Sequence, residues 1–299
     1  MKKNSLFLSV LIIVCSLRLY AGDYRPVTII EANWGNGDGE FGLMREAEGN
    51  CPQAMAIDDQ ANLAILDAAN RRVQMYNSDG EWIGRFAISS QAFDIGFEND
   101  RIVLLAPYDY VIEQYNLQGQ IIEKTKISPK IEFIDGLRIS DHKIFVQTVD
   151  QVQFNVSVRS QTKQLRSIQQ GISSRTPGIR IQTRWIDPHR GDLLIDSGSS
   201  GKSQTISITT HNELGSIIFL DTDKSENIFI RKELFSNNGK PYFEVDKYDK
   251  DGQFLITVQI ENENLVTPFK PITIDENGNI YFLEIKADGF FVIRWEEQN

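Results

Sequence analysis

Side chains that could do acid–base or metal chemistry are few in this 299-residue sequence, and they are scattered. It holds only three histidines, His142, His189 and His211, in the dissimilar contexts SDHK, DPHRGD and THNE. A metal ion that activates water needs about three protein ligands converging on one point. Because the histidines share no spacing or local pattern, we expect neither a convergent metal site from them nor a bound cofactor.

Two segments resemble ligand-binding loops but miss a required residue. Residues 197–203, SGSSGKS, end like a phosphate-binding loop, but Asp196 stands where that loop needs its first glycine. Residues 246–252, DKYDKDG, resemble part of a calcium loop, but Val258 stands where the chelating glutamate belongs. We therefore expect both segments to be hairpin turns.

A repeat supplies the elements that must position any functional residue. Residues 52–86 and 271–295 share an apolar pair, Asp, three turn residues, Asn and then alternating apolar residues. Asn62 in the first copy and Asn279 in the last are 217 residues apart, or five steps of about 43 residues. That period is typical of four-stranded propeller blades.

A second marker gives the same period. Gly80 in YNSDGEW and Gly252 in YDKDGQF are 172 residues apart, or four steps of about 43 residues. With this period, weaker copies are predicted between the two clear ones: Asp94–Ile127, Gly136–Ile168, Arg184–Thr210 and Ser216–Ile260.

Each copy alternates apolar and polar residues over four to seven positions, as half-buried strands do. Turn-forming clusters separate these runs, and no long run has a helical apolar period. We predict an all-β fold, a six-bladed β-propeller of four-stranded antiparallel blades. The last copy is one strand short, so we expect the N-terminal run Pro26–Trp34 to close the ring.

Two of the turn clusters are acidic, and two interpretations of them stay open. Residues 221–227, DTDKSEN, and 275–279, DENGN, could each hold a cation weakly. Their recurrence at the same phase of the repeat favours a role in building the turn.

The lead-in WGNGDGEFG, residues 34–42, precedes a copy that ends in RRVQMYNSDG. Together these segments resemble the NHL-repeat family of six-bladed β-propellers. The residues that match the family pattern are Asp58, Asn62, Asp67, Asn70, Arg72, Val73, Asp79 and Gly80. The resemblance implies the fold, whereas a fold of this kind hosts many functions. It covers the first and last copies well and the middle copies poorly.

The N-terminus is typical of an exported bacterial protein. Lys2 and Lys3 precede an apolar run of about a dozen residues, too short to span a bilayer comfortably. We predict a signal peptide over residues 1–21 and a single propeller domain over residues 22–299 in the periplasm or outside the cell. A lipoprotein signal ending at Cys15 is the alternative, and no transmembrane span is expected in the mature chain.

Charge and cysteine content narrow the class of partner. The formal charge of −10 becomes −13 when Lys2, Lys3 and Arg18 are removed with the signal peptide. Such acidity disfavours binding to nucleic acid or to anionic membranes. Cys51 would be the only cysteine of the mature chain, so no intramolecular disulfide is expected, and we expect Cys51 to be buried at a junction between blades.

A propeller offers a ligand one predictable place, the mouth of its central channel, where the loops into the innermost strands meet. By repeat phase, the residues at this mouth are Gln53, Asp94, Asp135, Arg184, Trp185 and Lys270. Such polar and aromatic groups suit a noncatalytic module that binds a protein, peptide or glycan. The alternative is a metal-dependent lyase or lactonase-type hydrolase whose site in the channel includes Asp94 and Asp135. A third possibility is an envelope scaffold.

Overall fold

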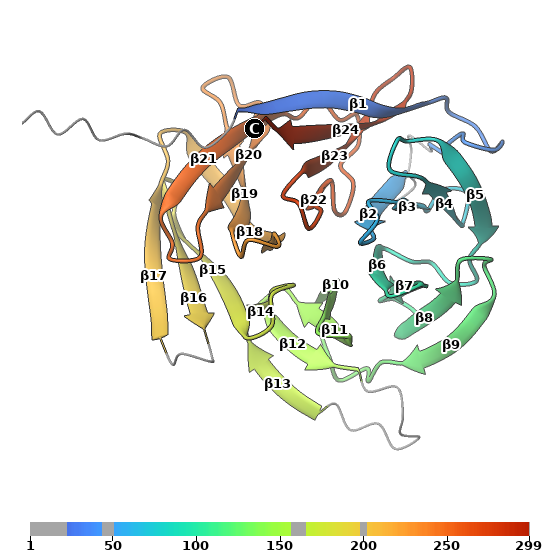
Figure 1. Ribbon diagram of the computed structural model, residues 1–299, viewed down its shortest axis with the longest axis horizontal. Helices are drawn as coiled ribbons and strands as arrows, with labels where there is room; N and C mark the ends of the chain where they lie inside the picture. The colour runs from blue at the N-terminus through green and yellow to red at the C-terminus, as the bar shows by residue number, and fades with distance from the viewer. Residues whose placement is uncertain (1–22, 44–50, 157–165, 198–201, 299) are drawn as a thin grey trace, which may run out of the picture.

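Six four-stranded antiparallel sheets form a ring in the computed structural model of the protein (Figure 1). The structure describes residues 23–43, 51–156, 166–197 and 202–298. In this part of the chain all regular elements are strands, which confirms the predicted all-β six-bladed propeller. The predicted signal peptide and Cys15 lie outside the described residues.

The first three blades follow one another along the chain, each with its innermost strand first. The first blade consists of β2 (Pro52–Ile57), β3 (Leu63–Asp67), β4 (Arg72–Tyr76) and β5 (Trp82–Ala87). The second consists of β6 (Asp94–Glu98), β7 (Arg101–Ala106), β8 (Val111–Asn116) and β9 (Ile121–Lys126). The third consists of β10 (Ile134–Ser140), β11 (Lys143–Thr148), β12 (Val152–Asn155) and β13 (Arg166–Gln170).

The remaining blades complete the ring. The fourth consists of β14 (Ile172–Ser173), β15 (Ile179–Asp187), β16 (Arg190–Ser197) and β17 (Lys202–Thr209). The fifth consists of β18 (Glu213–Thr222), β19 (Ile228–Phe235), β20 (Pro241–Tyr248) and β21 (Phe254–Glu261). The sixth combines β22 (Ile272–Ile274), β23 (Ile280–Ile285) and β24 (Phe290–Glu297) with β1 (Tyr24–Ala32) from the other end of the chain.

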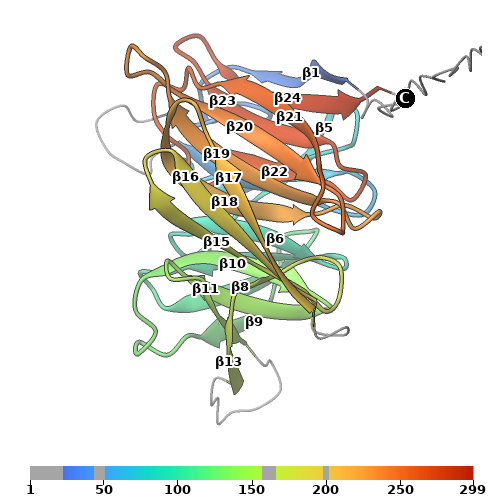
Figure 2. The same cartoon turned by 90° about the vertical axis from the view of Figure 1, so that its left-hand side faces the viewer.

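The N-terminal strand closes the ring, as predicted from the short last repeat. β1 pairs antiparallel with β24 from Tyr24↔Glu297 to Ala32↔Phe290, with a bulge between Thr28 and Ile30. Figures 1 and 2 both show β1 beside β24 at the outer edge of the sixth blade. The pairing covers the edge of β24, which would otherwise be open to another chain.

The core lies between neighbouring blades, because each sheet buries both faces against the next. β3 is buried along its whole length, from Leu63 to Asp67. Cys51 belongs to the apolar cluster between the sixth and first blades, with Phe290 and Tyr281, so the predicted burial at a blade junction is confirmed. Burial raises the pKa of the Cys51 thiol to about 12.

The recurrent Asp and Asn residues build turns. In the hairpin after β2, one Asp58 carboxylate oxygen accepts hydrogen bonds from the backbone N–H groups of Gln60 and Asn62, and the other accepts one from the Asn62 side chain. Asp223 with Asn227, and Asp275 with Asn279, repeat this arrangement. The recurring Asp and Asn therefore close the hairpin through their side chains, and turn building accounts for Asp223 and Asp275 in the two acidic clusters.

The residues that resemble the NHL pattern attach the lead-in loop to the first blade. Buried Arg72 pairs with buried Asp67 at 2.8 Å and donates hydrogen bonds to the carbonyl oxygens of Asn36 and Glu40. Asp67 also accepts a hydrogen bond from the backbone N–H of Gly42. This part of the motif is structural here, because Asp67 and Arg72 hold residues 35–42.

The fourth blade begins earlier than the sequence predicted. We expected its first strand at Arg184, but the innermost strand is β14, only two residues long, and Arg184 lies on the second strand, β15. Gly171, with a φ of +83°, is the only residue between β13 and β14. A junction of one residue carries no turn cluster, so the repeat period alone could not locate it.

Candidate ligand site at the channel mouth

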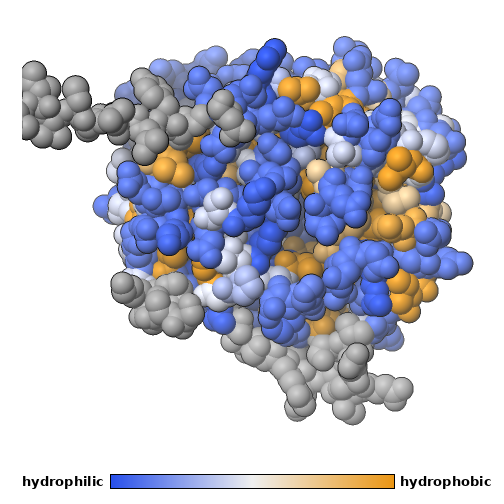
Figure 3. Space-filling view, in the orientation of Figure 1, coloured by the Kyte–Doolittle hydropathy of each residue, from blue (hydrophilic) through white to orange (hydrophobic). Residues whose placement is uncertain are grey.

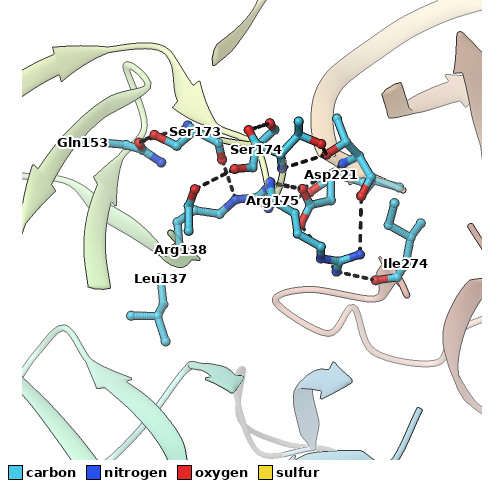
Figure 4. Close-up of polar contacts among 12 residues, drawn as sticks. Leu137, Arg138, Gln153, Ser173, Ser174, Arg175, Asp221 and Ile274 are labelled. Carbon is cyan, nitrogen blue, oxygen red and sulfur yellow. Dashed lines mark hydrogen bonds and ion pairs between the residues drawn. The ribbon is translucent and has the colours of Figure 1, made fainter. Parts of the chain in front are cut away.

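Two arginines and one aspartate cross the middle of the ring (Figure 4). Asp221, at the end of β18, pairs with Arg138 of β10 at 2.6 Å and with Arg175, which follows β14, at 3.6 Å. These residues come from the fifth, third and fourth blades. We call Arg138, Asp221 and Arg175 the channel bridge.

Hydrogen bonds fix both ends of the channel bridge. Arg138 donates to the carbonyl oxygens of Ser173 and Leu220, at 2.8 and 2.7 Å. Arg175 donates to the carbonyl oxygen of Ile274 in the sixth blade, at 3.3 Å. The bridge therefore connects four of the six blades across the channel.

A cavity lies on each side of the channel bridge. The first, which we call the mouth cavity, has a volume of about 220 Å³ and its charged lining residues are Asp135, Arg138, Arg231 and Lys270. The second, of about 400 Å³, lies at the hairpins that join first and second strands. Its lining includes Arg175 and His142 and the acidic residues Asp58, Asp59, Glu98, Asp141 and Glu276.

Four of the six predicted mouth residues come together. Lys270 lies just before β22 and forms an ion pair with Asp94, the first residue of β6. The backbone N–H of Lys270 donates to the carbonyl oxygen of Gln53, at 2.8 Å. Asp135 and Lys270 line the mouth cavity. Gln53, Asp94, Asp135 and Lys270 therefore lie together at one end of the channel, and their role in binding a ligand stays a prediction.

Arg184 and Trp185 do not line the mouth cavity, because they belong to a second strand. Half-exposed Arg184 pairs with Asp192 on the neighbouring β16 at 2.6 Å. The indole N–H of Trp185 donates to the carbonyl oxygen of Leu214 at 2.8 Å. The positions that Arg184 and Trp185 were expected to fill belong instead to the start of β14, where Ile172 lines the cavity.

Asp94 has no free carboxylate oxygen. One oxygen accepts the backbone N–H of Ile95 at 2.8 Å, and the other accepts the N–H of Leu137 at 2.6 Å and pairs with Lys270. Asp94 is fully buried, so these partners replace water around its charge. It ties the second, third and sixth blades together, and it is not available as a ligand for a metal ion.

Asp135, in contrast, has an unpartnered oxygen. Its Oδ1 is buried without a hydrogen-bond partner. Burial raises the pKa of Asp135 to about 6, in spite of the nearby charge of Lys270, and the charge of Asp94 adds to the rise. Asp135 therefore changes its protonation state close to neutral pH, on the wall of the mouth cavity.

The sequence did not single out Arg138 and Arg231. Both are cations within apolar strand segments, GLRIS and IFIRKELF, where a charge must find a partner or a cavity. A cation within an apolar strand was therefore the feature that could have identified both residues. We did not recognise it, because each strand also fits the ordinary alternation of apolar and polar residues.

Aromatic side chains lie beside the mouth cavity, at the same end of the ring. Phe269 lines the cavity. The ring centroid of Phe93 lies 6.2 Å from that of Phe269 and 5.1 Å from that of Tyr108. Tyr108 is 74% exposed. Phe133 is 73% exposed and its carbonyl oxygen accepts the backbone N–H of Val149, so both belong to this end. We call Phe93, Tyr108 and Phe269 the aromatic rim.

The predicted metal-dependent alternative lacks a donor set in the part of the chain that the structure describes. No three His, Cys, Asp or Glu side chains converge there to hold a metal ion. His142 lies in the hairpin from β10 to β11, and His189 in the hairpin from β15 to β16, at opposite ends of the blades. His211 lies between β17 and β18.

The comparisons with known proteins show the fold alone. No protein-family model matches the sequence, and no curated protein does. A DUF4221 family member from Bacteroides vulgatus is 9% identical over 93% of this chain and 99% of its own, with a TM-score of 0.55. A luciferin-regenerating enzyme is 11% identical over 85% of this chain and 94% of its own, with a TM-score of 0.50. Virginiamycin B lyase from Staphylococcus aureus is 10% identical over 91% of this chain and 99% of its own, with a TM-score of 0.48. The chain is thus similar to six-bladed propellers, and membership of the NHL-repeat family stays a prediction.

Proposed function

We propose that the protein is a noncatalytic binding module, and that its protein, peptide or glycan ligand inserts a group into the mouth cavity. One observation carries this proposal: the aromatic rim continues directly from a cavity that contains unpartnered charged groups. Ligand sites commonly combine an apolar wall with a few polar groups that fix orientation. The channel bridge gives the cavity a floor, so a ligand group would enter from the rim.

The face of the ring seen in Figure 3 is mostly hydrophilic, and its hydrophobic residues form small separate groups. A face of this kind offers a partner no large apolar patch. No helix in the described part of the chain is long and apolar enough to span a membrane.

Export remains part of the proposal. A signal peptide over residues 1–21 would release the propeller into the periplasm or medium, whereas lipidation at Cys15 would tether it to the envelope. Globomycin, which blocks lipoprotein maturation, separates the two. A mobility change on treatment supports the anchored form, and unchanged mobility of a cleaved chain supports the free form.

The binding proposal is tested by filling the mouth cavity. Ile218 lies on β18, lines the cavity and is 39% exposed, so Ile218→Trp should occupy the space without disturbing a closed core. Ile122→Trp, on the outer strand β9, is the matched control. Ligand-observed NMR with a mixed fragment library should find compounds that bind the wild type and the control but not Ile218→Trp. If every hit binds all three proteins equally, the site is elsewhere.

A further inference from the structure

Of the three cations that line the mouth cavity, two have an anionic partner in the described chain and one does not. Arg138 is paired with Asp221, and Lys270 is paired with Asp94. Arg231, in the middle of β19, forms no ion pair and donates no hydrogen bond to any residue that the structure describes, and its Nε is buried without a partner. Among the cations that line this cavity, Arg231 alone lacks an anionic partner in the described chain.

The surroundings of Arg231 position its guanidinium without neutralising it. The group lies over the ring of Phe243, 5.0 Å from the centroid, in a cation–π contact. Burial lowers the pKa of Arg231, and the one charge that counters this effect is Glu233, two residues along the same strand. Glu233 accepts a hydrogen bond from Ser216 at 3.3 Å, so it is held without contacting the guanidinium. Neither Asp94 nor Asp135 forms an ion pair with Arg231, so its positive charge is not neutralised by the acidic residues at the mouth.

Arg231 is only partly buried, but its buried, unpartnered Nε has lost water without gaining a partner, which is costly for the free protein. An anion that enters the cavity would recover that cost, and a carboxylate matches the two parallel N–H groups of the arginine fork. Ile218 and Ile272 line the same cavity as Arg231, and Phe269 belongs both to the cavity wall and to the aromatic rim. The expected ligand therefore has a charged end and an apolar body.

We infer that Arg231 is the recognition residue for a carboxylate borne on an apolar or aromatic body, which inserts into the mouth cavity with its body against the aromatic rim. This inference rests on the proposed binding function and names its ligand class. Two sources share this chemistry, a small organic acid and the end of a peptide chain.

The test compares two probes that differ only in charge, N-acetylphenylalanine and its neutral amide. Isothermal titration should give the wild type a dissociation constant at least tenfold lower for the acid than for the amide. Arg231→Met should remove this preference, and Arg231→Lys should retain part of it. Arg190→Gln, a change at an exposed arginine on β16, should leave the preference intact.

The affinity of the Glu233→Gln variant for the acid probe distinguishes a binding role of Arg231 from a purely structural one. Removing the acid beside Arg231 should strengthen binding of the acid probe and leave the amide unchanged. A glycine- and serine-rich hexapeptide ending in Phe distinguishes the sources. Tighter binding of the hexapeptide than of N-acetylphenylalanine identifies a peptide end, and equal or weaker binding identifies a small acid.

The inference is overturned if the wild type binds acid and amide equally, or if the preference survives in Arg231→Met. If neither probe binds while the fragment screen finds ligands blocked by Ile218→Trp, the carboxylate inference fails and the binding function stands. If the screen also finds no such ligand, the binding function itself fails.

Discussion

At the scale of single residues, the buried charges of this protein have two different fates. Arg72 is saturated by Asp67 and by carbonyl oxygens of the lead-in loop. Arg231, near the channel, is only partly buried, but its Nε is buried without such partners. The sequence motif included Arg72 and did not include Arg231, so the resemblance located a structural residue and missed the arginine that we propose for binding.

Arg72→Met should destabilise the protein by about 3 kcal/mol, because it leaves the buried carboxylate of Asp67 without its cation. Arg85→Met is the matched control, since Arg85 also donates to the carbonyl oxygen of Asn36 but lies at the surface. The control should cost less than about 1 kcal/mol. Urea denaturation measures both, and equal losses would contradict a structural role for the buried pair.

Asp135→Asn should stabilise the protein at high pH and not at low pH. Burial raises the pKa of Asp135 from its ordinary 3.8 to about 6, so the folded state binds the proton more tightly than the unfolded state. Wild-type stability is therefore lost as the pH rises through 6, by up to about 2 kcal/mol. The gain from Asp135→Asn should appear at pH 8 and vanish below pH 4.

Urea denaturation at the two pH values checks this dependence. Asp79→Asn, a change in the exposed turn between β4 and β5, is the control and should show no such dependence. A gain from Asp135→Asn that is the same at pH 4 and pH 8 would mean that the Asp135 carboxyl is not perturbed by burial.

At the scale of elements, the turns explain how far the sequence could be read. The Asp–Asn hairpins after β2 and β22 gave the repeat its period, and the strands predicted around them are present. The fourth blade was misplaced because β14 has two residues and Gly171 alone separates it from β13. A turn that is closed by its own side chains has a recognisable sequence pattern. A strand as short as β14, which exists only because it pairs with β15, has none.

Gly80→Ala should be much more destabilising than Gly239→Ala. Both glycines have positive φ, +82° and +77°, so each alanine carries a backbone cost of about 1 kcal/mol. A Cβ at Gly80 would also lie 1.8 Å from the carbonyl oxygen of Ile29 in β1, whereas a Cβ at Gly239 meets nothing within 4 Å. Displacing β1 should add about 2 kcal/mol or more.

Thermal denaturation of the two variants tests this contact between the first blade and the closing strand. Equal melting temperatures for Gly80→Ala and Gly239→Ala would show that β1 does not press on the turn of the first blade.

At the scale of the whole molecule, two devices hold the ring together, the β1–β24 pairing at its edge and the channel bridge at its centre. The sequence predicted the first, because the last repeat lacked a strand. It could not predict the second, because Arg138, Arg175 and Asp221 are brought together only by closure of the ring. Repeat phase fixes the starts of inner strands, so Gln53, Asp94, Asp135 and Lys270 lie at one end of the channel, whereas Arg184 and Trp185 lie on β15 because the start of the fourth blade was misplaced.

Deleting residues 23–32 should expose the edge of β24 and produce soluble aggregates, which light scattering after size exclusion would detect. A synthetic peptide with the sequence of Tyr24–Ala32 should restore the monomer by strand addition. A truncated chain that stays monomeric with an unchanged melting temperature would contradict the role of β1 in closure.

The most direct test of binding in the mouth cavity is native mass spectrometry of gently purified protein, with elemental analysis of the same sample. The proposed function predicts a copurified organic ligand on the wild type that is absent from Ile218→Trp, and no stoichiometric metal. A stoichiometric metal, or an identical adduct on the blocked variant, would contradict binding in the mouth cavity and bring the metal-dependent lyase or hydrolase to the front.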